Sequence, residues 1–404
     1  MRKFMTFGLM ATALVLGSTP LIKSNQQNLE ARDARIIVKF KASTENKTRE
    51  QVLYYQNSAL SYIRANVTDN FEVKDRYTNM LNALLMQVPA SKVNSLRNLN
   101  FVDQIDYDTL HVYDGGEAVS YTLYSQGYRA KLNDDESVNV SARTMNVPAV
   151  SNEGEGILIG ILDSGFLLNH YDEETKQTYT HETFTDLPAE VKVKIDGVDE
   201  LKALVDAAGD DFHGKYDATH TTYFNRKVPF YFDYAGSSAK SGEDGTPDYD
   251  VYSTQSDHGL HVASLAAGNA PTYKGIAPKA QLALFKVFTE YTSGGTSAYD
   301  SNILKGLEDA AALGCDVLNM SLGTDLNDFD EDSLTVKLLN SLESKGIFCN
   351  VAAGNAGKGY YQLIGAYANW TTEMVETGIL STYSNVMIYR TTIIKELTTM
   401  PMNS

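Results

Sequence analysis

The sequence predicts an α/β protein in which a doubly wound parallel sheet follows a small α+β unit. From Glu155 onward, short apolar segments alternate with segments of helical periodicity, and this alternation is typical of parallel β-α-β architecture. Before it, residues 31–113 show the order β-α-β-β-α-β, which is the order of a ferredoxin-like unit. With 404 residues, the chain is long enough for two or three units.

The elements of the first unit are predicted from alternation and from helical spacing. Ile36, Val38 and Phe40 alternate with Ile37 and Lys39, as in a strand that buries one face. The elements that follow are a helix, two strands, a second short helix and a last strand, over residues 48–67, 71–77, 82–88, 90–99 and 102–112.

A linker and a larger unit follow. Residues 114–150 lack sustained periodicity, so we expect a linker there, and the larger unit spans residues 151–385. Its first strand is an apolar run that ends at Asp163, and open α/β sheets place their sites at the carboxyl ends of strands. The long polar interval between Asp163 and His258 predicts an insertion. The later strands and helices are expected at residues 281–287, 316–320 and 347–352, and at 259–268, 298–313 and 332–345.

Composition excludes some classes of partner. The chain carries 51 acidic and 34 basic side chains, a formal net charge of −17, which argues against binding to nucleic acid or to an anionic membrane. A hydrophobic fraction of 43% is that of a globular protein.

The first 24 residues resemble an export signal. Arg2 and Lys3 precede an apolar stretch from Phe4 to Gly17, and small residues follow it. This stretch is shorter than the roughly 20 apolar residues that cross a bilayer, so a membrane span is not expected. The sequence therefore predicts a protein that is secreted or held at the cell envelope.

The two cysteines lie in or beside predicted strands. Cys315 precedes one strand and Cys349 lies within another, so both are expected to be buried. Adjacent strands could bring the two thiols together, and the sequence leaves pairing open.

Three short motifs stand at strand or helix ends. Asp163-Ser164-Gly165 follows the first strand of the larger unit, His258-Gly259-Leu260-His261 opens a helix of small residues, and Ala352-Ala353-Gly354-Asn355 ends another strand. A histidine acts as a general base near neutral pH when a carboxylate holds one ring nitrogen and the other faces the reacting group. Asp163 and His258 are the candidates for this pair.

The three motifs, in this order, resemble those of the subtilisin-like serine proteases. The stretch Asn225–Tyr234 and the Asp257-His258-Gly259 segment resemble the cell-envelope branch of that family, the lactocepin and C5a-peptidase group. The resemblance implies cleavage of protein or peptide substrates, with no cofactor required. It also implies that residues 31–113 are a prodomain that inhibits the enzyme intramolecularly.

The resemblance implies a role for each matched residue. Asp163 would be the catalytic acid, His258 the base and Asn355 the side-chain donor to the oxyanion. Ser321, Leu322 and Gly323 would pair with an extended peptide, and Gly354 would line the opposite wall.

Each site has a simpler interpretation. Asp and Asn are common in turns, so Asp163 and Asn355 could each be a turn residue. His258 and His261 have helical spacing, but Gly259 stands where a zinc peptidase has glutamate, so no metal site is predicted there. Calcium is possible in the acidic segments 243–257 and 325–332, although neither fits the EF-hand pattern and solvated loops are favoured.

The nucleophile of the family is missing from its usual place. No Gly-Thr-Ser-x-Ala motif follows Asn355. Gly295-Thr296-Ser297-Ala298 has similar letters but precedes Asn355, and we expect Ser297 to cap the next helix. Residues 386–404 depart from the family, which predicts an incomplete catalytic unit from a fragment, a shifted reading frame or a decayed gene. The alternative function is a non-catalytic secreted protein that binds peptides or a protease.

Overall fold

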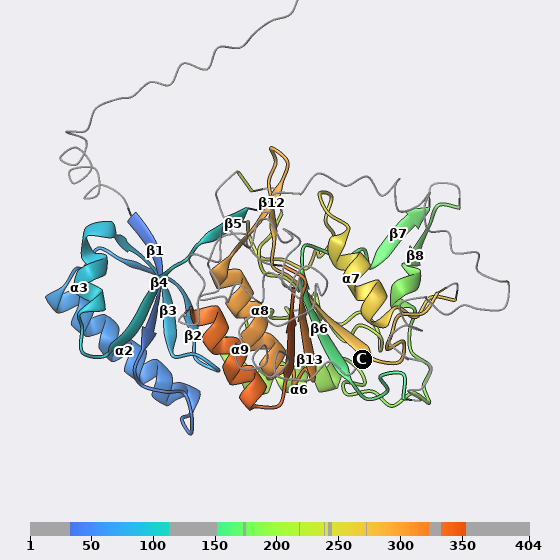
Figure 1. Cartoon of the computed structure of the whole chain (residues 1–404), viewed down its shortest axis with the longest axis horizontal. Helices are drawn as coiled ribbons and strands as arrows, with labels where there is room; N and C mark the ends of the chain where they lie inside the picture. Colours follow the sequence, from blue (N-terminus) through green and yellow to red (C-terminus); the bar gives the residue numbers. More distant parts are fainter. Residues whose placement is uncertain are drawn as a thin grey trace, which may run out of the picture.

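The computed structural model describes residues 33–112, 152–172, 175–217, 219–237, 239–240, 245–271, 273–322 and 333–352 (Figure 1). The predicted signal peptide, the linker, the acidic segment 325–332 and the tail 386–404 lie outside these residues. Gly323, Gly354 and Asn355 lie outside them as well. The described chain forms an N-terminal α+β unit and a larger unit built on a parallel sheet.

The N-terminal unit has the predicted β-α-β-β-α-β order. Its antiparallel sheet has the strand order β2-β3-β1-β4. A capping box between Thr48 and Gln51 starts the first helix. The elements are β1 (Asp33–Phe40), α2 (Arg49–Asn66), β2 (Glu72–Tyr77), β3 (Ala83–Pro89), α3 (Val93–Arg97) and β4 (Val102–Tyr107).

This small sheet is buried on both faces. Ile36 and Val38 of β1 pack with Leu60 and Ile63 of α2. Ile37 was expected on an open face, but it is only 1% exposed because its side chain belongs to the core of the larger unit. The expectation of a single buried face is therefore wrong, because it assumed that the N-terminal unit stands alone.

The larger unit is organised around five parallel strands in the order β14-β13-β6-β10-β9. All six residues of the central strand β6 are buried, as its unbroken apolar run predicts. Gly160 lies where a Cβ would approach Leu318 Cδ2 to 2.4 Å, so any larger residue would require the buried Leu318 side chain to move. The strands are β6 (Leu158–Asp163), β9 (Phe230–Asp233), β10 (Gln281–Lys286), β13 (Val317–Met320) and β14 (Phe348–Val351).

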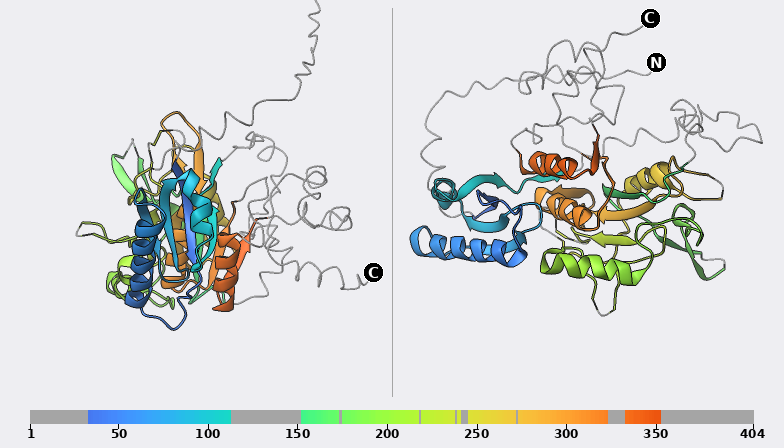
Figure 2. Two further views of the ribbon diagram at one scale, coloured as in Figure 1. Left: turned by 90° about the vertical axis from the view of Figure 1, so that its left-hand side faces the viewer. Right: turned by 90° about the horizontal axis from the view of Figure 1, so that it is seen from below.

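Helices cover both faces of this sheet, so the predicted doubly wound α/β class is confirmed. Ala263 and Ala267 of α7 (His258–Ala267) pack on one face. Leu304 and Leu307 of α8 (Asp300–Ala312) and residues of α9 (Leu334–Ser344) and α6 (Val198–Ala208) pack on the other. Figure 2 shows the blue N-terminal unit lying on the α8 and α9 side, with yellow α7 away from it.

Short strands join the two units and extend the insertion. The strand β5 (Leu110–Val112), at the end of the N-terminal unit, pairs antiparallel with β12 (Thr296–Tyr299), which also pairs with β11 (Thr289–Glu290). The insertion between β6 and α7 carries α6, β9 and the hairpin of β7 (Asn169–Asp172) and β8 (Gln177–Thr180).

The described residues settle two expectations about burial and hydropathy. Cys315 and Cys349 are both buried free thiols, so they do not form a disulfide. Burial raises the pKa of Cys349 to about 12, which keeps the thiol protonated and unreactive at neutral pH. Within the described ranges, none of the helices combines the length and the apolar character that a bilayer crossing requires.

Candidate active site

Asp163 and His258 meet at the carboxyl end of β6. The Nδ1 atom of His258 lies 2.9 Å from the Oδ1 atom of Asp163. Asp163 is 1% exposed, whereas the side chain of His258 is 35% exposed and reaches solvent. A buried carboxylate thus holds one nitrogen of a histidine whose ring is partly open, as a general base requires.

Gly259 explains how helix α7 approaches the strand end so closely. A Cβ at this position would lie 2.5 Å from the carbonyl oxygen of Gly165 and 3.0 Å from Asp163 Cβ. Any larger residue would push the helix away from β6 and separate His258 from Asp163. The glycine of the His-Gly motif therefore has a packing reason in this fold.

Three serines hold the start of α7: Ser164 of the first motif, and Ser253 and Ser256, which the sequence analysis did not single out. The hydroxyl of Ser164 donates to Ser256 Oγ at 2.9 Å, and Ser256 Oγ also accepts the backbone N–H of His258 at 3.3 Å. Ser253 Oγ accepts the backbone N–H of Ser256 at 3.0 Å. The contact between Ser164 and Ser256 joins residues 92 positions apart, so no local pattern could have shown it.

The environment of His258 favours its protonated form. The hydrogen bond with Asp163 raises the pKa of His258 above its ordinary value, burial opposes this shift, and the charge of Asp257 adds to it. With Nδ1 facing the carboxylate, Nε2 is the nitrogen positioned to exchange a proton with a reacting group.

We expect Asp163→Asn to lower the pKa of His258. The hydrogen bond to Asp163 is the largest cause of the raised pKa, and without it burial would move the pKa to or below its ordinary value of about 6.5. A titration of the histidine ring protons by NMR measures this change. Asp257→Asn is the matched control and should lower the pKa less, since the charge of Asp257 is the weakest of the causes. Equal shifts in the two variants would contradict the assignment of Asp163 as the partner.

The predicted substrate strand lies next to this pair. In the sheet, Met320 at the end of β13 is in register with Leu162, the residue before Asp163. Ser321 and Leu322 follow directly; Ser321 Oγ accepts from the Asn319 side chain at 2.9 Å, and Leu322 packs in the core. The structure thus places these two residues beside the strand end that carries Asp163.

Ser297 does not cap a helix, and this expectation is wrong. The segment Thr296–Tyr299 is the strand β12, so the helix α8 begins only at Asp300, and its N-cap residue Tyr299 makes no side-chain cap. The Ser297 side chain is 0% exposed and hydrogen bonds with the hydroxyl of Tyr291. Strand pairing with β5 and β11 outweighs the capping preference of serine here.

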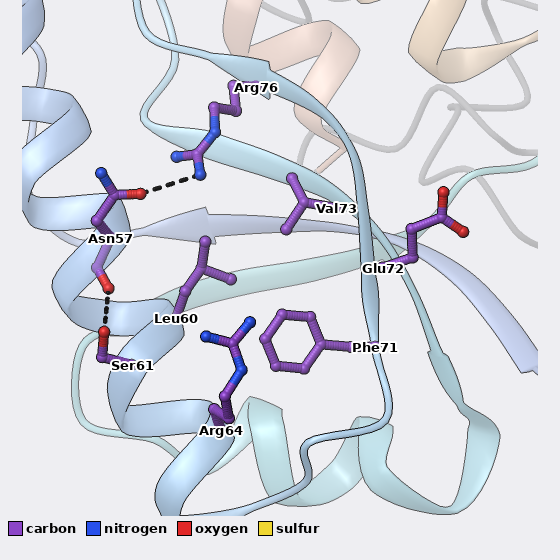
Figure 3. A pocket seen from close by; sticks show the side chains of 8 residues that line it. All are labelled: Asn57, Leu60, Ser61, Arg64, Phe71, Glu72, Val73 and Arg76. Atoms are coloured by element: carbon purple, nitrogen blue, oxygen red, sulfur yellow. Dashed lines mark hydrogen bonds between the residues drawn. The ribbon is translucent and has the colours of Figure 1, made fainter.

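Other candidate sites are less developed in the described residues. No group of three or more His, Cys, Asp or Glu side chains within them could hold a metal ion. A shallow pocket of about 550 Å³ belongs to the N-terminal unit, where the guanidinium of Arg64 lies 5.1 Å from the centre of the Phe71 ring (Figure 3). Its walls come from α2 and the β2 region, so it is not part of the Asp163–His258 site.

Comparison with known proteins decides the family. The model of the subtilase family, Peptidase_S8, matches residues 154–389. The chain belongs to the subtilase family. The resemblance stated from the three motifs is therefore confirmed, and Asp163 and His258 both lie in the matched region.

Relatives support the predicted branch. The chain is 33% identical over 212 residues to a PI-type proteinase of Lactococcus lactis subsp. cremoris, which covers 51% of this chain and 9% of the relative. It is 27% identical over 255 residues to a C5a peptidase of Streptococcus pyogenes serotype M3. This match covers 55% of this chain and 18% of the relative. The minor extracellular protease Vpr of Bacillus subtilis is 23% identical over 341 residues. This match covers 84% of this chain and 34% of the relative. This subtilase chain thus spans between about a tenth and a third of the length of these relatives.

Proposed function

We propose that this subtilase is a secreted serine endopeptidase that cleaves peptide bonds by acyl transfer. The contact between His258 Nδ1 and Asp163 Oδ1 at 2.9 Å carries the proposal, because a buried carboxylate and a partly open imidazole form the acid–base part of such a site. Secretion is supported by the export-signal pattern of residues 1–24 and by the name of one relative, an extracellular protease.

In the proposed reaction, His258 moves the protons. A serine hydroxyl attacks the carbonyl carbon of the substrate while Nε2 of His258 takes its proton, and Asp163 stabilises the imidazolium. The side-chain amide of Asn355 donates to the oxyanion of the tetrahedral intermediate. The C–N bond then breaks as His258 gives the proton to the leaving amine, and water hydrolyses the acyl-enzyme by the same route. No residue of this chain is assigned as the serine nucleophile.

The substrate would bind in an extended conformation beside β13. Backbone groups of Ser321, Leu322 and Gly323 would pair with the peptide, and Gly354 would form the opposite wall. Because β13 is the neighbour of β6 in the sheet, a peptide on its extension would run past the Asp163–His258 pair.

We also propose that residues 31–113 inhibit the catalytic unit. Two observations support this: β5 already occupies an edge of β12, and the small sheet packs on α8 through buried side chains such as Tyr77 and Leu81. A strand on that edge would compete with any extended peptide that approached it.

A non-catalytic role is the second candidate, and one observation favours it. The Gly-Thr-Ser stretch that ends at Ser297 is the segment whose sequence is most similar to the family's nucleophile motif. Ser297 is fully buried. In this role the chain would bind peptides or a protease without cleaving them.

A serine-directed fluorophosphonate separates the two candidates. We first expect the DNA downstream, read in all frames, to contain a Gly-Thr-Ser-x-Ala codon run. The extended chain should label at that serine, and His258→Ala should lose the label because the hydroxyl is no longer activated. The absence of such a codon run would reject the peptidase proposal, and labelling of Ser297 in the 404-residue chain would reject the non-catalytic one.

A further inference from the structure

His213 lies at the contact between the N-terminal unit and α8. It follows the short 3₁₀ turn Gly209–Asp211 of the insertion, and its side chain is only 7% exposed. Its Nδ1 atom lies 3.6 Å from Asp75 Oδ2 on β2, and its Nε2 atom lies 3.6 Å from Glu308 Oε2 on α8. The ring therefore stands between one carboxylate of each unit.

Further charged groups surround His213. The Asp309 carboxylate on α8 accepts the backbone N–H of His213 at 2.9 Å, and Lys305 Nζ lies 3.0 Å from Asp75 Oδ2. The ring of Tyr77 on β2 packs against the imidazole, with 5.6 Å between ring centres. The groups that face His213 are thus three carboxylates and one ammonium, on β2 and α8.

The contacts require a positive charge on His213. Among the residues that the structure describes, neither His213 Nε2 nor Glu308 Oε2 has a hydrogen-bond partner, so a charged imidazolium is what compensates this buried carboxylate oxygen. Burial alone would lower the pKa of His213, but the carboxylates of Asp75 and Glu308 and the charge of Asp309 outweigh it and raise the pKa to about 10. In the docked arrangement the ring is therefore protonated throughout the neutral range.

Undocking removes one of the negative charges around His213. When residues 33–112 leave, Asp75 leaves with them, while Glu308 and Asp309 stay on α8 with His213. Water also reaches the ring. The docked and undocked states thus differ in their affinity for a proton at His213.

We propose that His213 is a pH-sensitive latch: its protonated ring holds the N-terminal unit on α8, and the contact loosens in mildly alkaline solution, where the ring releases its proton when the unit undocks. Because the folded, docked pKa is raised, the contribution of His213 is complete below its ordinary pKa of about 6.5 and is lost as the pH rises toward about 10. One linked proton weakens docking by at most about tenfold per pH unit in this window.

The acid side of the contact behaves differently. Burial alone would raise the pKa of Asp75, but His213 and Lys305 outweigh it and lower the pKa well below its ordinary value. Asp75 therefore keeps its charge, and its contribution, at every pH above about 4. Burial raises the pKa of Asp309 to about 6, which is also below the window of His213. Asp75 and Asp309 therefore do not account for loosening between about pH 6.5 and pH 9.

The functional consequence of the latch rests on the proposed inhibitory role: if residues 31–113 inhibit the catalytic unit, alkaline pH would favour their release. The test of the latch needs no peptidase activity. The backbone N–H groups of Met80 and Leu81 donate to Glu308 Oε1 at 2.9 and 2.8 Å across the contact, so their hydrogen exchange reports docking.

Exchange is measured on the full chain at about pH 6 and about pH 8.5, relative to amides in the centre of β3 as an internal reference. We expect the relative protection of Met80 and Leu81 to fall about tenfold or more between the two conditions. His213→Gln should lose this pH dependence, and His220→Gln, which changes an exposed histidine, should keep it. An unchanged ratio in the wild-type chain, or the same slope in His213→Gln, would overturn the latch.

An NMR titration of the wild-type chain keeps the test valid if His213→Gln fails to fold. The ring of His213 should stay protonated beyond about pH 8, and in Asp75→Asn it should titrate at a lower pH. A wild-type ring that titrates near its ordinary pKa of about 6.5 would reject the proposal, whatever the outcome for peptidase activity.

Discussion

Asp233→Ala is expected to destabilise the larger unit by about 3 to 5 kcal/mol, because it leaves the ammonium of Lys286 buried without a counter-charge. Both side chains are 0% exposed, and Lys286 Nζ lies 2.6 Å from Asp233 Oδ2. Within the described part of the chain, the ammonium would keep one acceptor, the carbonyl oxygen of Phe288 at 3.0 Å. The backbone N–H groups of Ala235 and Gly236, which donate to Asp233 Oδ1, would lose their acceptor as well.

Urea denaturation followed by circular dichroism measures this loss. Lys279→Ala is the control: it breaks an exposed ion pair with Glu153, and such pairs contribute at most about 1 kcal/mol. The double variant Asp233→Asn with Lys286→Met removes both charges and keeps an oxygen for the two N–H groups, so it should recover most of the loss. If Asp233→Ala costs no more than Lys279→Ala, the buried pair does not have the role assigned to it.

The Asp233–Lys286 pair is linked to the candidate active site because β9, β10 and β6 are neighbouring strands. Lys286 of β10 is the cross-strand neighbour of Asp163, and the backbone N–H of Val287 donates to the Asp163 carbonyl at 3.1 Å. On its other side, Lys286 is in register with Asp233 of β9. The buried pair therefore fixes the strand ends on which the position of Asp163 depends.

The sequence predicts well those features that depend on chain-local patterns. The apolar run of β6 and the small-residue helix of α7 are visible as periodicity, and the rule for strand ends in open α/β sheets places Asp163 near His258. The ferredoxin-like order of the first unit follows from the same kind of pattern. These features need no knowledge of which elements touch.

Features that depend on contacts between distant segments were missed. The strand β9 is a four-residue edge strand inside the insertion, too short to show a period. Ser297 was misplaced because the pairing of β12 with β5 joins segments almost two hundred residues apart. His213 and Lys286 are charged residues whose burial is explained only by partners on other elements, so sequence spacing carries no signal for them.

Glu308→Ala is expected to loosen the contact between the two units by about 2 to 4 kcal/mol. The side chain of Glu308 on α8 is almost fully buried, and its Oε1 atom accepts hydrogen bonds from the backbone N–H groups of both Met80 and Leu81. Without this acceptor two donors at the contact are left unsatisfied, at about 1 to 3 kcal/mol for each that stays buried. Opening the contact to water would relieve this cost, so undocking becomes more favourable.

A reporter away from Glu308 is needed, because Met80 and Leu81 lose their own hydrogen bond in the variant. The backbone N–H of Ser301 donates to Asp108 of the N-terminal unit at 2.8 Å, and its hydrogen exchange should speed up by the factor that corresponds to the loosening. Glu308→Gln is the matched comparison: it keeps an oxygen acceptor for both N–H groups but removes a carboxylate from the His213 cluster. It should therefore loosen the contact less than Glu308→Ala at about pH 6 and weaken its response to higher pH. Unchanged protection of Ser301 in Glu308→Ala would show that the carboxylate does not hold the two units together.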